Sequence, residues 1–207
     1  TGTTATLQGT VNANNSDTTD LTIKYADDES TVTGGGGTSA TVSPSSATGS
    51  SNTSVSASLT GLTPGTQYWY RVSATNGVGT TNGDTETFTT ASLPTVTTNA
   101  ASDVTTSSAT LNATVNANGS DTTALSYKYS ADRATVEQGG GDSPTSITPG
   151  SVTGSTDTAL TAPLTGLTPG TTYYYRFAAT NAGGTTNGAI VSFTTLSNGG
   201  GGGGGSA

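Results

Sequence analysis

The chain has 207 residues and a formal net charge of −8, with five Lys and Arg residues against thirteen Asp and Glu residues. So few basic residues argue against a nucleic acid partner, because phosphate binding needs clustered Lys or Arg. No apolar run approaches the ~20 residues of a membrane-spanning helix. The absence of Cys and His excludes disulfides, thiolate nucleophiles and imidazole catalysis. We therefore expect a protein that is not an enzyme, uses no cofactor and does not insert into a membrane.

The first half of the chain shows the two-residue period of half-buried β-strands. Apolar residues alternate with polar ones in Leu21–Tyr25, in Val55–Leu59 and in Tyr68–Ala74. Gly, Asn and Pro residues mark turns between these segments, and a Gly/Ser/Thr stretch at residues 33–54 predicts a long loop. Because no segment has a sustained 3.6-residue period, the pattern predicts an all-β fold.

The second half of the chain repeats the first. LTGLTPGTQYWYR at residues 59–71 returns as LTGLTPGTTYYYR at residues 164–176. ATLQGTVNANNSDTT at residues 5–19 returns as ATLNATVNANGSDTT at residues 109–123. These offsets of 105 and 104 residues are too long for a solenoid, whose repeats are typically ~20–50 residues. They indicate two copies of one domain.

The Pro-Gly corner of each copy resembles the fibronectin type III family. The motif LTPGTQY ends at Tyr68, and LTPGTTY ends at Tyr173. In that family the tyrosine makes a tyrosine corner, with its hydroxyl bonded back to the backbone, so the resemblance implies this structural role for both residues. It also implies a bacterial-type secreted or cell-surface protein. The predicted organisation is two tandem immunoglobulin-like, fibronectin type III-like β-sandwiches at residues 1–92 and 93–196, with a Gly-rich C-terminal tail at residues 197–207.

The two copies differ at their start. The second begins with residues 94–104 (PTVTTNAASDV), which we expect to form strand A, whereas residue 1 aligns with residue 105, just before strand B. The first sandwich is therefore predicted to lack strand A, which a longer tandem chain or another subunit would supply. The tail carries seven consecutive glycines, and Gly can pack closely against another backbone. We therefore expect assembly contacts at both ends of the chain, at Thr1, Leu7, Asn198, Gly203 and Ala207.

Few side chains suggest a ligand site. Trp69 and Tyr174 occupy equivalent positions that should point outward, where an aromatic ring can stack on a sugar or anchor an interface. Cross-strand packing is the structural alternative. Asp27, Asp28 and Glu29 could hold Ca²⁺, but the cluster is not repeated in the second copy, and a solvated turn is the favoured interpretation.

Two further charged positions have structural interpretations. Lys24 and Lys128 fall at matching strand positions, where outward alternation predicts solvated side chains. Glu86 falls where the second copy has Val191. A charge there is either a guard against pairing of an edge strand or a plain exposed residue.

Repetition without catalytic chemistry favours a structural protein. We predict an extracellular or cell-surface subunit or segment of a filament, sheath or adhesin. It would assemble with other copies of itself or with adjoining domains, through its chain termini and by strand donation. Two alternatives stay open. One is a carbohydrate-binding or spacer module of a secreted polysaccharide-degrading enzyme, with glycans as partners, and the other is a phage tail or decoration protein.

Overall fold

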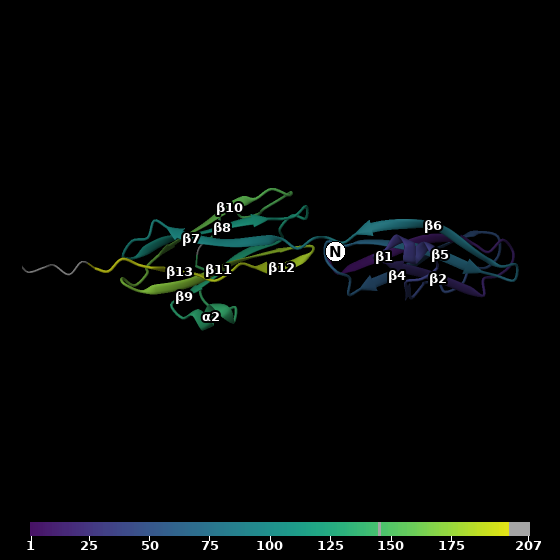
Figure 1. Cartoon of the computed structure of the whole chain (residues 1–207), viewed down its shortest axis with the longest axis horizontal. Coiled ribbons are helices and arrows are strands. Elements are labelled where there is room, and N and C mark those ends of the chain that lie inside the picture. The colour runs from purple at the N-terminus through teal and green to yellow at the C-terminus, as the bar shows by residue number, and fades with distance from the viewer. Residues whose placement is uncertain (145, 199–207) are drawn as a thin grey trace, which may run out of the picture. The chain divides into compact units, whose positions relative to one another are not determined.

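The computed structural model describes residues 1–144 and 146–198, which fall into two compact units divided between Ser92 and Leu93. Both are antiparallel β-sandwiches, as predicted (Figure 1). Unit 1 consists of β1(Thr4–Asn12), β2(Asp20–Ala26), α1(Glu29–Thr33), β3(Thr38–Ala40), β4(Asn52–Thr60), β5(Gln67–Thr75) and β6(Thr80–Thr89). Unit 2 consists of β7(Thr95–Ser102), β8(Ser108–Asn116), β9(Ala124–Ser130), α2(Arg133–Glu137), β10(Thr158–Thr165), β11(Thr172–Asn181), β12(Gly184–Asn187) and β13(Val191–Thr194).

Each unit packs a smaller sheet against a larger one. In unit 1 the strand orders are β1-β4 and β3-β2-β5-β6. In unit 2 they are β10-β8-β7 and β12-β11-β13, with β9 also paired to β11. The smaller sheets differ by one strand, because β7 lies beside β8 in unit 2 and the described part of unit 1 has no strand on the corresponding side of β1.

The alternating sequence builds the cores. Along β8 every second residue is buried, and the same holds for β11 from Tyr173 to Asn181. The alternation of burial is weaker in unit 1, where β1 buries only Leu7 and Val11 and carries Gly9 between them. Two separate apolar clusters result, one in each sandwich.

Each unit also contains one short helix that the sequence pattern did not predict. α1 follows Asp28, α2 follows Asp132, and both carboxylates accept hydrogen bonds from backbone N–H groups of the first helical turn. Such N-caps satisfy donors that have no partner within the helix. With five residues each, neither helix is long enough to show a period. No helix in the described part of the chain is long and apolar enough to cross a membrane.

Candidate functional site at the free edge of strand β1

The two corner tyrosines make the same contact in both units. The hydroxyl of Tyr68 accepts a hydrogen bond from the backbone N–H of Thr63 (3.1 Å), and that of Tyr173 accepts one from Thr168 (3.0 Å). Both side chains are 9% exposed. Buried groups with satisfied hydrogen bonds of this kind stabilise a fold and are not available to a ligand.

The aromatic residues predicted to face outward lie on the middle strands of the larger sheets. Trp69 on β5 and Tyr174 on β11 are both half-buried. Their cross-strand neighbours are small, namely Ala26 and Thr87 for Trp69 and Ser130 and Ser192 for Tyr174. The residues directly opposite each ring on the neighbouring strands are thus short.

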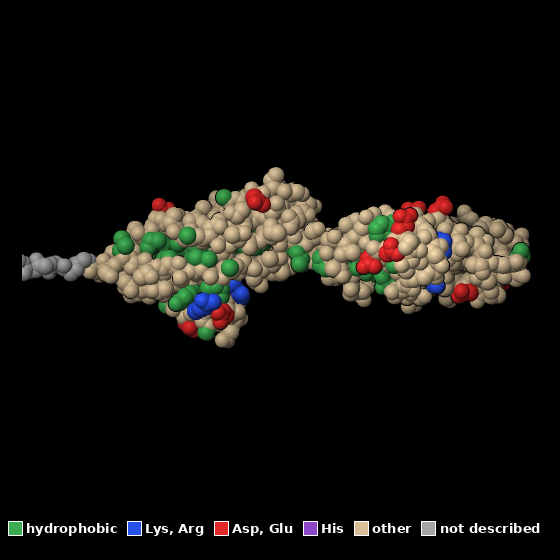
Figure 2. All heavy atoms as spheres, in the orientation of Figure 1, with side chains coloured by type: hydrophobic (Ala, Val, Ile, Leu, Met, Phe, Trp, Pro, Cys, Tyr) green, Lys and Arg blue, Asp and Glu red, His purple; other side chains and the backbone are tan. Residues whose placement is uncertain are grey.

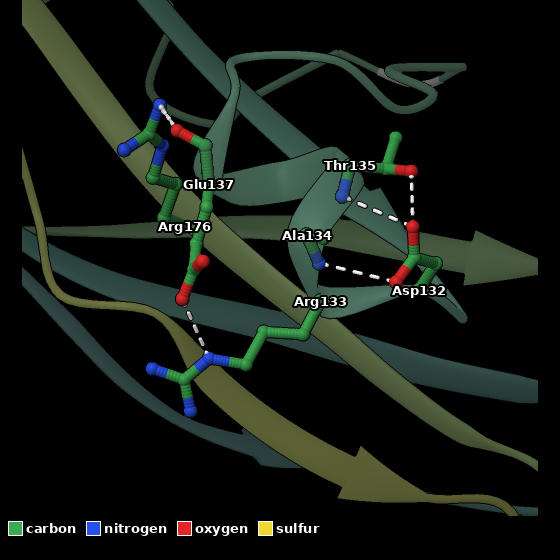
Figure 3. Close-up of polar contacts among 6 residues, drawn as sticks. All are labelled: Asp132, Arg133, Ala134, Thr135, Glu137 and Arg176. Atoms are coloured by element: carbon green, nitrogen blue, oxygen red, sulfur yellow. Dashed lines mark hydrogen bonds and ion pairs between the residues drawn. The ribbon is translucent and has the colours of Figure 1, made fainter.

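Next to these aromatics, a Lys and an Arg lie opposite each other across two strands, in both units. Lys24 Nζ donates to the carbonyl of Gly35 (2.6 Å), and Lys128 Nζ donates to that of Gly141 (3.3 Å). Arg176 donates to the carbonyl of Glu137, at the end of α2 (3.5 Å; Figure 3). The lysines were predicted to be solvated. Instead they hold the loop after each helix, because glycine carbonyls lie within their reach.

Asp28, the acidic residue at the start of α1, likewise makes its hydrogen bonds within the fold. The Asp28 carboxylate accepts hydrogen bonds from the hydroxyls of Thr31 and Ser30 (2.7 Å each) and from the N–H of Thr31 (2.9 Å). The Thr31 hydroxyl, then that of Ser30, lowers the pKa of Asp28 to about 2. Figure 3 shows the equivalent cap of α2, where Asp132 accepts from Ala134 and Thr135. Among the described residues, no group of three or more Asp, Glu, His or Cys could hold a metal ion.

The residues predicted at assembly contacts divide into three groups. Thr1 and Asn198 are exposed. Leu7 is 2% exposed and packs in the core of unit 1, because it points to the inner face of β1, so its side chain is not available to a neighbouring subunit. Gly203 and Ala207 lie outside the described residues.

The feature that the structure adds is the backbone of β1 on the side away from β4. Ser56 on β4 exchanges two backbone hydrogen bonds with Ser43 (2.8 and 2.9 Å), on its side away from β1. Its cross-strand partner Gln8 therefore presents its own N–H and C=O to the free edge. On that side, among the residues that the structure describes, the Tyr70 hydroxyl donates a hydrogen bond to the Gln8 carbonyl (3.2 Å). This edge can accept a further strand.

A groove of about 410 Å³ runs beside this edge, between the two sheets of unit 1. It is lined by Gln8, Gly9, Thr10, Tyr70, Val72, Gly83, Asp84 and Glu86. In unit 2 the corresponding place is covered by β7, which contacts β11, β12 and β13. The groove thus lies where one sandwich of this chain carries a strand and the other does not.

Burial of the larger sheet follows from this difference. Tyr175 and Phe177 on β11 are 0% exposed, whereas the equivalent Tyr70 and Val72 on β5 are only half-buried. Burial raises the pKa of Tyr175 to about 12. On the face drawn in Figure 2, apolar side chains form a row along unit 2, and acidic side chains gather over unit 1.

The sequence had indicated this edge only through the alignment of residue 1 with residue 105. The lining residues Gln8, Tyr70 and Asp84 were missed. Tyr70 and Asp84 lie on the consecutive strands β5 and β6, whereas Gln8 on β1 is about 60 residues away in the chain and no local motif links it to them. Glu86 was noted, and it is exposed at the rim of the groove.

These features define a pair of immunoglobulin-like sandwiches, one of which has a free strand edge. Residues 1–90 match the family model of the fibronectin type III domain. Unit 1 is therefore a fibronectin type III domain. Unit 2 repeats its motifs and strand arrangement, so the chain carries tandem fibronectin type III-like domains.

Solved structures match the chain at low identity and with low TM-scores. The sensor domain of the anti-sigma factor RsgI4 of Pseudobacteroides cellulosolvens is 18% identical, with a TM-score of 0.36 over 51% of this chain and 96% of that chain. The FN1–FN3 domains of chicken CNTN1 are 14% identical, with a TM-score of 0.30 over 94% of this chain and 95% of that chain. The central Fibronectin-III array of RIM-binding protein is 16% identical, with a TM-score of 0.27 over 96% and 66%. No curated protein matches the chain.

Proposed function

We propose that this chain is a non-catalytic extracellular structural module, a subunit or segment of a surface filament, sheath or adhesin. It connects to other copies of itself or to adjoining domains through the edge of β1. The observation that carries the proposal is the backbone of Gln8, which faces outward beside a groove that a strand fills in unit 2. Unpaired strand edges are templates for pairing with another chain.

The disposition of the charged residues supports a structural role. Lys24, Lys128 and Arg176 hold loops, and Asp28 and Asp132 cap helices. Catalysis by carboxylates or by an activated nucleophile needs such groups to converge on a pocket. The fibronectin type III domain is also typical of extracellular proteins, which supports the location.

The experiment compares the intact chain with a variant whose edge is blocked. Gln8→Pro removes the N–H that faces outward, while the ladder between β1 and β4 keeps its hydrogen bonds. We expect the intact chain to form complexes with the domains that adjoin it in sedimentation velocity runs, and Gln8→Pro to remain unbound. Gln8→Ala is the matched control and should associate normally. A chain that is monomeric at all concentrations, alone and with the domains that adjoin it, would contradict the proposal.

A second candidate function is glycan recognition by the outward aromatics. It is favoured by the equivalent placement of Trp69 and Tyr174, which are both partly exposed and lie opposite short side chains. Aromatic faces of this kind can stack on sugar rings. The test is retention on insoluble glycans, where Trp69→Ala and Tyr174→Ala together should abolish binding. Val78→Ala is the control, since Val78 is 90% exposed and lies away from both rings. Equal retention of all variants would reject this function.

A further inference from the structure

We propose that the free edge of β1 binds an extended segment of another polypeptide, antiparallel to β1. The first half of this segment is uncharged and β-branched, and its second half carries a Lys or Arg residue. The inference rests on the proposed function, because it assigns a partner to the same edge. Its basis is unit 2, in which the same chain shows how the corresponding edge is covered.

The pairing of β7 with β8 in unit 2 gives the expected register of the segment along β1 in unit 1. Val96 and Thr98 lie opposite the residues of β8 that the repeat aligns with Val11 and Gly9 of β1. Residues two apart in a strand point to the same face of the sheet, so a β-branched pair at these positions would lie over the groove. Beside Gly9 the side chain of Val72 fills the space that a Cβ atom of Gly9 would take, so the pair would lie over Val72.

Contacts beneath β7 show what this pair does. The Thr98 hydroxyl accepts a hydrogen bond from the buried backbone N–H of Phe177 (3.2 Å). Gly188 packs directly under Thr98 and Val96, so closely that a Cβ atom there would overlap the Thr98 hydroxyl. The equivalent Gly83 in unit 1 has the Val72 carbonyl oxygen, at 3.4 Å, as the nearest neighbour of such a Cβ atom. A glycine thus lies at this position in both units, and in unit 1 no strand lies above it.

Two equivalent tyrosines donate their hydroxyls to different carbonyls, depending on whether a strand covers the edge. In unit 2 Tyr175 donates to the backbone carbonyl of Asn99 on β7. In unit 1 the equivalent Tyr70 donates to the carbonyl of Gln8 on β1 itself. An incoming strand would take that carbonyl into its ladder and offer Tyr70 its own carbonyl instead, so no hydrogen bond would be lost.

The requirement for a basic residue comes from the part of the groove lining that is charged in unit 1 and apolar in unit 2. Unit 1 has Asp84 and Glu86 where unit 2 has Ala189 and Val191. In unit 2 Val191 and Ala101 of β7 both pack against the core cluster. The groove of unit 1 is lined by two carboxylates, so a copy of β7 would bring apolar side chains to a charged surface. A Lys or Arg at the position of Ala101 would pair with them, and the net charge of −8 also favours the approach of a basic partner.

The same carboxylates argue against a second copy of this chain as the occupant. Two β1 edges paired with each other would bring two acidic grooves together, and like charges in close approach are unfavourable. The occupant is therefore a foreign segment with at least one basic residue.

The test uses the full chain and two synthetic peptides as probes. One has the sequence of residues 94–102 (PTVTTNAAS), and the other is the same peptide with Ala101→Lys. Hydrogen exchange of the β1 amides reports occupancy of the edge, with β8 as the internal reference because β7 already covers it. Fluorescence of Trp69, the single tryptophan, follows unfolding of unit 1 alone. We expect the Lys peptide to slow exchange along β1 and to raise the unfolding midpoint of unit 1. It should bind roughly three- to fivefold more tightly than the neutral peptide at low salt, the range of an exposed ion pair.

The matched control converts the groove of unit 1 to that of unit 2 by Asp84→Ala and Glu86→Val. This variant should prefer the neutral peptide. The proposal is wrong if neither peptide protects β1, or if the preference for Lys survives in the converted groove. Protection of β1 that rises with chain concentration in the absence of peptide would identify a second copy as the occupant. That last outcome would overturn this inference while supporting the proposed function, so the two fail separately.

Discussion

Unit 1 and unit 2 are one domain in two forms that differ by strand β7. Where β7 is present, Tyr175 and Phe177 of the facing sheet are completely buried. Where no such strand is described, Tyr70 and Val72 remain half-buried. The comparison shows that one edge strand decides how much of the opposite sheet belongs to the core, because it closes the gap between the two sheets.

The sequence of unit 1 is adjusted to its open edge. Gly9 replaces the Ala113 of unit 2, and a Cβ atom at Gly9 would lie only 2.6 Å from Cγ2 of Val72. Glu86 replaces Val191 at the rim. Smaller and charged residues thus occur in unit 1 where unit 2 has apolar packing against β7. This pattern fits a surface that is solvated part of the time and then covered by a polar or basic strand.

The largest expected effect comes from truncating the side chains beneath β7. Phe177→Ala should destabilise unit 2 by about 3–5 kcal/mol, since a fully buried aromatic is replaced by a cavity. The equivalent Val72→Ala should cost unit 1 only about 1 kcal/mol, because Val72 is already partly solvated. Urea unfolding followed by Trp69 fluorescence for unit 1 and by hydrogen exchange for unit 2 measures both. Comparable losses in the two units would show that the open edge is covered in solution.

A second prediction concerns Gly188 and Gly83, the equivalent glycines beneath the edge in the two units. Gly188→Ala should destabilise unit 2 by about 1–3 kcal/mol, because its Cβ atom would overlap Thr98 and push β7 away. Gly83→Ala should change the stability of unit 1 by less than about 0.5 kcal/mol, since nothing packs over it. The exchange rates of the β7 amides should rise in Gly188→Ala. A large loss in Gly83→Ala would mean that unit 1 is already occupied by a strand.

The sequence predicted the fold well because the repeat and the Pro-Gly corner are local patterns. Alternation placed β2, β4, β5 and their copies, and the alignment of residue 1 with residue 105 indicated the open edge. The short helices could have been found from Asp28 and Asp132, each followed by Thr three residues later, which is the spacing of an N-cap contact. The groove could not, because Gln8 meets Tyr70 and Glu86 only when β1 packs against the distant pair β5 and β6. The alternating pattern likewise could not show that the Lys24 ammonium bonds to the carbonyl of Gly35, because the position of that carbonyl depends on the path of the loop after α1.

The smallest expected effect compares the two helix caps at acid pH. Hydrogen bonds from the Thr31 and Ser30 hydroxyls lower the pKa of Asp28 to about 2, and those from Thr135 and Ala134 lower the pKa of Asp132. A carboxylate whose pKa is lower in the folded state stabilises the fold above its ordinary pKa of about 3.9. That contribution is lost as the pH falls through the pKa of the folded state.

The Asp28 cap should therefore hold at pH 4 and release as the pH falls toward about 2, and the Asp132 cap should release below the ordinary pKa of its carboxyl. The measurement is a titration by NMR of the amides of Thr31 and Thr135, whose shifts follow the carboxylates they contact. Asp28→Asn should remove the step at Thr31 and leave the one at Thr135 unchanged. The end of α2 is also held by the ion pair of Arg133 with Glu137 (2.8 Å), which contributes little because both side chains are solvated. A midpoint near the ordinary value at Thr31 would mean that the Asp28 hydroxyl contacts do not persist in solution, and that α1 is held mainly by Val32 and by the loop bonded to Lys24.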